Sequence, residues 1–309
     1  MTRTQRVFLV LVMCQLSLLL ARTVLPASQS HGRAARVPFV GCASYLGGRY
    51  QEGSTSEAAA LLKEAAVDPK TVVQDKTTAP ESVGMPRPAV DLTVGTWKYK
   101  ETFVAPIGGT DHSTYSITIK DDGGVWTVTT AMEFSEGPVT DVSTLEKGTL
   151  ILRKESFEHF AHPGQPWKPV AIKLEFTGNK VTGAMKYVSG QDKPVAIDLG
   201  GPLFAGPDVT IGCLPLADGY STTFRYFDID RFALNPQASN TVKLVQLRVV
   251  GMERVTVSAG TFDSYRVELT SADGGSNKAT IWIGKDSRML VRASAVDELY
   301  GAITTEMVP

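Results

Sequence analysis

Hydrophobic and polar residues alternate with a period of two from Leu92 to the end of the chain. This alternation is typical of β-strands with one buried face. The first three runs are Trp97, Tyr99 and Phe103 against Lys98, Lys100 and Thr102; Tyr115, Ile117 and Ile119 against Ser116, Thr118 and Lys120; and Trp126, Val128, Thr130, Met132 and Phe134. The stretch Asp121-Asp122-Gly123-Gly124 lies between the second and third runs, and its composition predicts a hairpin turn.

Further strands are predicted along the rest of the chain, with tight turns such as Thr177–Lys180 between them. They cover residues 150–157, 170–176, 181–188, 195–199, 220–227, 243–250, 255–257, 265–270, 280–283, 289–295 and 302–307. No long amphipathic helix interrupts them and no repeat of fixed period appears, which argues against a propeller. The pattern therefore predicts an all-β fold, an antiparallel meander curled into an open or partly closed barrel. Glycine and proline break the pattern over residues 200–219, a candidate boundary within a β domain spanning residues 91–309.

The segment after Val249 carries the most specific motif of the chain. It reads Val257-Ser-Ala-Gly260-Thr261-Phe262, followed by a Tyr-Arg-Val-Glu strand, a strand bearing Trp282, and Asp286-Ser-Arg288. We expect Gly260 to supply a positive φ, Thr261 to bond within the turn, and Phe262 to enter the core. These are structural roles in a turn.

This motif resembles an uncharacterised family of bacterial envelope proteins with a curved antiparallel sheet, similar to the lipoprotein-carrier half-barrel. The stretch Leu214–Arg225 looks like the strand entry that precedes the same unit. The resemblance covers residues 200–309 well and residues 92–200 by pattern only. Similar tails follow the catalytic cores of some exported bacterial hydrolases. The resemblance implies a fold and carries no established activity.

The N-terminal region has a different character. Arg3 and Arg6 precede an apolar run from Val7 to Leu20, which predicts a secretory signal peptide over residues 1–27 and a periplasmic or secreted protein; an uncleaved membrane anchor is the lesser alternative. Residues 28–90 are expected to be irregular, with a short helix over residues 55–67 and a proline-rich linker after it. Cys42 and Cys213 would remain after cleavage, and in an oxidising compartment they are candidates for a disulfide.

Charge excludes some classes of partner. The formal net charge is -1 and the lysine and arginine residues are scattered, so we expect no nucleic-acid partner. No phosphate-binding glycine loop and no serine nucleophile elbow is present, and no cofactor is predicted.

Three sets of residues have the composition of a metal site. His159 and His162 have a spacing that can chelate a metal, but they precede a loop with Pro163 and Pro166 rather than lying on a helix. Asp228 and Asp230 lack the residues that continue a calcium loop, and Asp121-Asp122 is better explained as a turn. The sequence therefore predicts no metal site as its first interpretation.

The leading hypothesis is an exported, non-catalytic β protein of the cell envelope. Its curved sheet would bind an apolar or lipid-like ligand, or a partner protein. Two alternatives stay open: an exported metal-dependent hydrolase that uses His159 and His162, and a structural accessory module related to the tails of exported hydrolases.

Overall fold

A computed structural model describes residues 84–104, 110–134, 137–161, 168–234, 241–272, 278–297 and 301–309. All of them belong to one compact unit, Ala35–Pro309. The expected signal peptide, the helix over residues 55–67 and most of the linker lie outside the described residues. The strands are β1 (Gly95–Val104), β2 (Thr110–Asp121), β3 (Val125–Phe134), β4 (Gly137–Glu146), β5 (Leu152–Glu158), β6 (Pro169–Thr177), β7 (Lys180–Tyr187), β8 (Asp192–Asp198), β9 (Ser221–Phe227), β10 (Val242–Val257), β11 (Gly260–Ser271), β12 (Lys278–Gly284), β13 (Leu290–Asp297) and β14 (Gly301–Val308).

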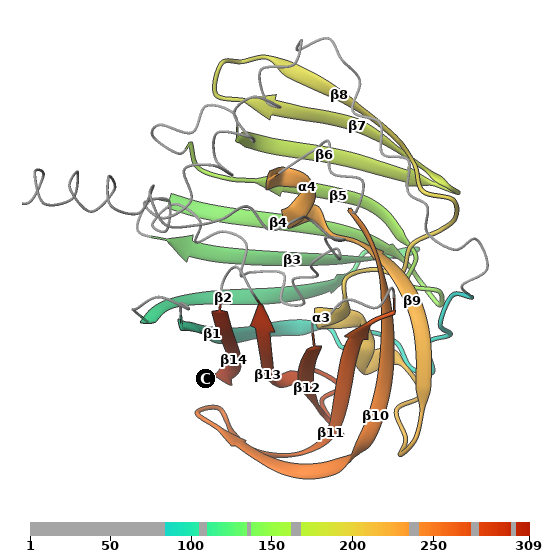
Figure 1. The fold of residues 1–309 in the computed structure, drawn as a ribbon, viewed down its shortest axis with the longest axis vertical. Helices are drawn as coiled ribbons and strands as arrows, with labels where there is room; N and C mark the ends of the chain where they lie inside the picture. Colours follow the sequence, from blue (N-terminus) through green and yellow to red (C-terminus); the bar gives the residue numbers. More distant parts are fainter. Residues whose placement is uncertain are drawn as a thin grey trace, which may run out of the picture. The chain divides into compact units, whose positions relative to one another are not determined.

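The fourteen strands form one antiparallel sheet, which is curved and not closed (Figure 1). Its order is β8-β7-β6-β5-β4-β3-β2-β1-β14-β13-β12-β11-β10-β9. Strands that are consecutive in sequence pair with each other, except β8 and β9, which form the two edges of the sheet, and the first strand β1 also pairs with the last strand β14. There Tyr99 lies opposite Met307 and Glu101 opposite Thr305. The predicted all-β meander is confirmed, and β1–β14 pairing joins its two halves.

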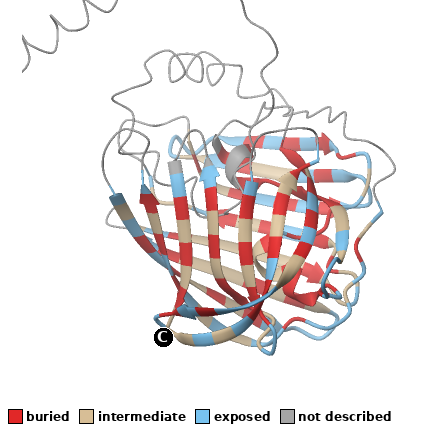
Figure 2. Ribbon diagram, turned by 60° about the horizontal axis from the view of Figure 1, so that its bottom comes forward, coloured by how far each residue is buried: buried red, intermediate tan, exposed pale blue. Residues whose placement is uncertain are grey.

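Buried residues alternate with more exposed ones along many of the strands, as the sequence pattern predicts (Figure 2). Two strands differ from the prediction. β4 was not predicted at all, and β10 is one strand where two were expected, because a bulge between Val249 and Gly251 interrupts the alternation without ending the pairing.

The outer strands β8 and β9 carry features that protect sheet edges. On β8 the buried Lys193 points inward beside the exposed Pro194, and an inward charge and a proline both disfavour addition of another strand. On β9 the buried Arg225 donates through Nη2 to the carbonyl of Leu199. The edges are thus tied to the connection between β8 and β9.

That connection, residues 199–216, is here called the inner segment. It runs along the concave face and contains the one-turn helix α3 (Pro207–Thr210) and the 3₁₀ turn η2 (Ile211–Cys213). Its apolar side chains are among the most buried of the described residues: Leu199, Leu203, Phe204, Ala205, Ile211, Cys213, Leu214 and Leu216. The inner segment, which makes up most of the candidate boundary at residues 200–219, therefore contributes these side chains to the core, and the strands before and after it belong to one sheet.

Two hairpin turns with the same geometry hold the inner segment. The first anchor turn, Glu146–Ile151, joins β4 to β5, and the second, Gly284–Met289, joins β12 to β13. Leu150 N donates to Glu146 O at 2.9 Å, and Arg288 N donates to Gly284 O at 2.9 Å. Leu150 has a φ of +55° and Arg288 a φ of +57°, the two non-glycine residues with positive φ in the described chain. The hydroxyls of Thr149 and Ser287 each accept from the backbone N–H two residues on, at 3.3 Å.

Each anchor turn contacts one end of the inner segment. Leu150 O accepts from Ala205 N at 3.1 Å, and Leu203 O accepts from Leu152 N at 3.1 Å. At the other end, Gly212 lies so close to the backbone of Arg288 that a Cβ on Gly212 would be 1.7 Å from its carbonyl oxygen. The Asp286-Ser-Arg288 motif thus forms the surface against which η2 packs.

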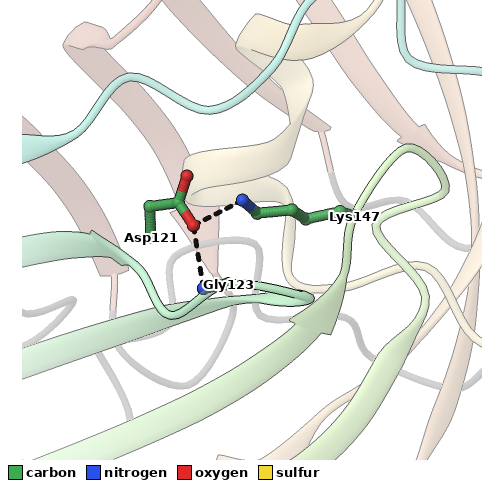
Figure 3. Close-up of polar contacts among 3 residues, drawn as sticks. All are labelled: Asp121, Gly123 and Lys147. Atoms are coloured by element: carbon green, nitrogen blue, oxygen red, sulfur yellow. Dashed lines mark hydrogen bonds and ion pairs between the residues drawn. The ribbon is translucent and has the colours of Figure 1, made fainter.

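The other predicted turns are present. Asp121 Oδ1 accepts from Gly123 N at 3.0 Å within the β2–β3 turn, and it also pairs with Lys147 of the first anchor turn (Figure 3). Gly260 has a φ of +139°, as expected. Thr261 differs from the expectation, since its hydroxyl bonds across the strands to Thr256 at 3.0 Å. Phe262 is only partly buried, because it packs at the periphery of the core near the hairpin end.

Replacing Gly212 by alanine should destabilise the protein by about 1–3 kcal/mol, the usual cost of forcing extra atoms into a packed interior. Urea unfolding would measure it. Gly206→Ala is the matched control in the same segment, since nothing lies within 4 Å of its added Cβ, and a change within about 0.5 kcal/mol is expected. Equal effects of the two variants would contradict the docking of η2 on the second anchor turn.

Candidate functional site

A cavity of about 100 Å³ lies between the concave face of the sheet and the inner segment. The sheet provides one wall, and the inner segment with the end of β9 and the start of α4 (Ile229–Leu234) provides the other. The lining mixes apolar and acidic side chains: Ile117, Val128, Thr130, Asp141, Ser143, Leu145, Leu152, Glu155, Ala205, Gly206, Pro207, Asp208, Val209, Tyr226, Phe227, Asp228 and Ile229. We call it the inner pocket.

Polar residues on three neighbouring strands form one side of the inner pocket. Thr130 on β3 lies opposite Asp141 on β4, and Ser143 on β4 lies opposite Glu155 on β5. Because inward side chains alternate along a strand, Asp141 and Ser143 share the concave face with Val139 and Leu145. The sheet therefore presents a polar patch flanked by core residues.

The opposite side is shaped by an arch of the inner segment, residues 206–209. The hydroxyl of Thr210 donates to the carbonyls of Ala205 at 3.2 Å and Gly206 at 2.9 Å, which fixes the base of the arch. Asp208 and Val209 are partly exposed and line the pocket, one charged and one apolar. Asp228 and Tyr226 complete this side.

The carboxyl group of Asp141 is held in an unfavourable place for a charge. Burial raises its pKa, and the nearby carboxylate of Asp208 raises it further, while a backbone hydrogen bond from Val142 acts in the opposite direction. Its Oδ1 is buried and has no hydrogen-bond partner among the described residues. Glu155, Asp208 and Asp228 each engage in other interactions within the molecule.

Glu101 is a second buried acid, at the junction of the two halves of the sheet. It is fully buried on β1 between Ser113 of β2 and Thr305 of β14, and Thr305 Oγ1 donates to its Oε1 at 3.2 Å. Burial raises its pKa to about 8, with hydrogen bonds from Thr305 and Ser113 opposing and the charge of Asp208 adding to the rise. Glu101 is therefore predominantly protonated at neutral pH.

The histidines predicted as a candidate metal pair are only half described. His159 follows β5, and its Nδ1 lies 2.7 Å from the carbonyl of Phe160, which requires the proton on Nδ1. Its ring packs against Phe157 and Phe160. Burial lowers the pKa of His159 to about 4, so its imidazole is neutral at pH 7. His162 lies outside the described residues, and the pair stays a prediction.

The structure describes Asp228 and Asp121, one from each of the two aspartate candidates for a metal site, and places them in different surroundings. Asp228 is buried in the wall of the inner pocket, whereas the side chain of Asp230 lies outside the described part. Asp121 lies at the exposed β2–β3 turn with Lys147, whose Nζ is also 4.5 Å from the centre of the Trp126 ring. Within the described ranges, no group of three or more His, Cys, Asp or Glu side chains is placed to hold a metal ion.

Cys213 is buried in the inner segment, and burial raises the pKa of its thiol to about 12. Its carbonyl accepts from Ala89 N at 2.7 Å and Val90 N at 3.2 Å, so this residue also holds the chain that leads into β1. Cys42 lies outside the described residues, and the Cys42–Cys213 disulfide remains a prediction.

The second half of the sheet provides an internal comparison for the pocket. The anchor turns define it: Leu145 pairs with Leu152 as Ile283 pairs with Leu290, each after the same shift in register. Counting along the paired strands from these two turns gives each pocket residue of β3–β5 an equivalent residue on β11–β13. Thr130, Asp141, Ser143 and Glu155 correspond to Leu269, Ala279, Ile281 and Ala293.

All four equivalent residues in the second half are apolar and buried. The same local geometry is therefore built without any polar group at these positions. The four polar residues that β3–β5 contribute to the inner pocket are therefore not needed to form these strands.

The sequence pattern points to Asp228, and to Glu155 only as a residue that precedes the histidine pair, but it does not indicate Asp141, Ser143 or Asp208. One signal was available on β1, where Glu101 falls on the face of Tyr99 and Phe103. An acid on the apolar face of an alternating strand points into the interior. β4 gave no such signal, because its inward Asp141 and Ser143 remove the alternation itself.

Glu101→Gln should make stability less dependent on pH. The folded-state pKa of Glu101 is raised, so its contribution to stability is fully present below pH 4.5 and is lost as pH rises toward about 8. The free energy of unfolding of the variant should match that of the wild type near pH 5 and be larger near pH 9. Each unit by which folding raises the pKa of Glu101 corresponds to about 1.4 kcal/mol of this difference. Urea unfolding at the two pH values measures this, and a larger advantage at pH 5 would contradict it.

Comparison with solved structures gave matches of low identity. One is a candidate exported protein with a YmcC-like fold from Bacteroides fragilis, 11% identical, covering 72% of this chain and 97% of that one, with a TM-score of 0.30. Another is a β-barrel-like protein of the family DUF1849 from Brucella abortus, 9% identical, covering 74% and 98%, with a TM-score of 0.34. A DUF1329 family protein from Desulfovibrio piger is 9% identical, covering 69% and 82%, with a TM-score of 0.25.

The comparisons do not show the expected similarity to the lipoprotein carrier, which stays a prediction. A search of curated proteins gave no match. Among the residues that the structure describes, no helix combines the length and apolar character needed to cross a membrane.

The match to a family model is more extensive than the motif on which the expected resemblance rested. It begins at Lys98 on β1 and runs to Val308 at the end of β14, and so includes both anchor turns, the inner segment and the inner pocket. The chain belongs to the family DUF3108, described as proteins of unknown function.

Proposed function

We propose that this protein is an exported, non-catalytic binding protein of the cell envelope, which holds a small amphipathic ligand in the inner pocket. The proposal narrows the apolar or lipid-like ligand expected from the sequence. A ligand that enters a cavity of about 100 Å³ must be small, or must insert only one end. The mixed lining suits a ligand with an apolar part and a hydrogen-bonding part.

The observation that carries the proposal is the difference between the two halves of the sheet. Leaving a buried polar group without a partner costs about 1–3 kcal/mol. The first half bears this cost at Asp141, whose buried Oδ1 has no hydrogen-bond partner in the described structure, whereas the second half has Ala279 at the equivalent position. The second half also has Leu269 and Ile281 where the first half has Thr130 and Ser143. A chain that keeps costly polar residues where its own fold accepts apolar ones is expected to use them in binding.

The arch supports the same proposal. Pockets that bind with little reorganisation are lined by groups held in place before the ligand arrives. Thr210 fixes the arch from below, and the hydrogen bonds of Phe204 and Ala205 fix its approach. Export is proposed from the basic and apolar pattern of residues 1–27.

The test transfers the residues of the second half into the first, in the variant Thr130→Leu/Asp141→Ala/Ser143→Ile. Its free energy of unfolding should equal or exceed that of the wild type, within about 1 kcal/mol, because apolar residues already occupy the equivalent positions. Native mass spectrometry of material purified from the envelope fraction should show a bound small molecule on the wild type and none on the variant.

Ile281→Ser is the matched control at the position equivalent to Ser143. It removes buried apolar atoms from the second half, so it should destabilise the protein by about 2–4 kcal/mol and leave ligand occupancy of the folded fraction unchanged. The proposal fails if the triple variant unfolds like this control, or if it keeps the bound molecule.

A further inference from the structure

The polar lining of the inner pocket has one chemical character. Its described polar side chains are the carboxyl groups of Asp141, Glu155, Asp208 and Asp228 and the hydroxyls of Thr130, Ser143 and Tyr226. None of the described lining residues is a lysine, arginine or histidine. The pocket therefore presents carboxyl groups, which accept hydrogen bonds when ionised and donate one when protonated, together with hydroxyls that serve as either partner.

Asp141 differs in its contacts from the other acids that line the pocket. Glu155, Asp208 and Asp228 are already engaged within the molecule. Asp141 lines the pocket with a buried Oδ1 that has no hydrogen-bond partner in the described structure. A buried acceptor of this kind calls for a donor, either a water molecule or a ligand.

The equivalent position in the second half gives independent support. Ala279 occupies it, is 1% exposed, and pairs with Leu269 as Asp141 pairs with Thr130. The fold therefore needs only a methyl group at this position, and Asp141 places a carboxyl group there instead.

Charge distinguishes between the ligand groups that could donate a hydrogen bond to Asp141. Burial raises the pKa of Asp141, and the carboxylate of Asp208 across the pocket raises it further, so Asp141 is driven toward its protonated form. A cationic group would relieve this repulsion and displace the proton, whereas a carboxylate ligand would add a further negative charge. A neutral alcohol would gain the hydrogen bond only.

We infer that the inner pocket recognises the ammonium end of a primary amine, with Asp141 as its principal acceptor and the apolar residues Leu145, Leu152 and Val209 against its hydrocarbon part. The inference rests on the proposed function and names the class of ligand. It excludes a fatty acid as the natural occupant, since its carboxylate would face acids on both sides of the pocket.

Three probes of equal chain length test it: butylamine, butanol and butyrate, each titrated into the full chain and followed by protein-observed NMR at pH 7.5. Butylamine should bind at least about tenfold more tightly than butanol, since an ion-paired hydrogen bond in a poorly solvated site is stronger than a neutral one, and butyrate should not bind. Shifts are expected at residues of β4 and of the arch.

Asp141→Asn should reduce butylamine binding to the level of butanol while leaving butanol binding unchanged. Asp192→Asn, an exposed aspartate on β8, is the matched control and should change neither. If Asp141→Asn does not fold, the pH dependence of the wild type replaces it. Butylamine affinity should rise between pH 5 and pH 8 as the proton on Asp141 becomes easier to displace, while butanol affinity stays constant.

The outcomes separate this inference from the proposed function. Binding of butanol or butyrate in the pocket at least as tightly as butylamine overturns the amine inference and leaves the pocket a ligand site. Failure of all three probes to bind there, together with wild-type material free of any bound molecule, overturns both. Butylamine binding that Asp141→Asn leaves intact overturns the role of Asp141.

Discussion

The docking of the inner segment between the two anchor turns is the constraint on which the rest of the structure depends. A curved sheet of fourteen strands that is not closed leaves a concave apolar face, which must be covered. Residues 199–216 cover it with Phe204, Ile211 and Leu214, and they connect β8 to β9 as they do so. Because the two ends are fixed at Leu150 and Arg288, the arch between them stands away from the sheet. The inner pocket lies under that arch.

The positive φ values of Leu150 and Arg288 have a reason in this docking. Glycine usually occupies such positions, and another residue there costs about 1 kcal/mol or more. Both turns aim a backbone carbonyl at the inner segment, and the contact offsets the strain. Because the two turns are equivalent, the residues of β11–β13 can be compared with those of β3–β5. The first set shows which side chains suffice for the fold, and the second shows which polar side chains are added at the pocket.

Much of the fold follows from sequence pattern, and the pocket follows hardly at all. Alternation predicted most strands, and glycine and aspartate predicted the turns at Asp121 and Gly260. The strand that carries Asp141 and Ser143 was missed because polar residues on its inward face cancel the alternation. Glu101 was not predicted as a buried acid for the opposite reason. The alternation on both sides of it is regular, and one acidic residue on the apolar face does not interrupt the pattern. The interior role of residues 200–219 could not be predicted, because glycine and proline in a long connection are typical of a surface loop, and only the pairing of distant strands places this one inside.

In this structure the inner segment is part of the core, and it holds the pocket in shape in advance of any ligand. Native-state hydrogen exchange tests it most directly. The amides of Phe204 and Ala205, which bond to Arg225 and Leu150, should exchange only through global unfolding, as slowly as amides in the middle of β3 and β11. Exchange of these two amides orders of magnitude faster than those of the sheet would show that the inner segment opens on its own, and would contradict a pocket formed in advance.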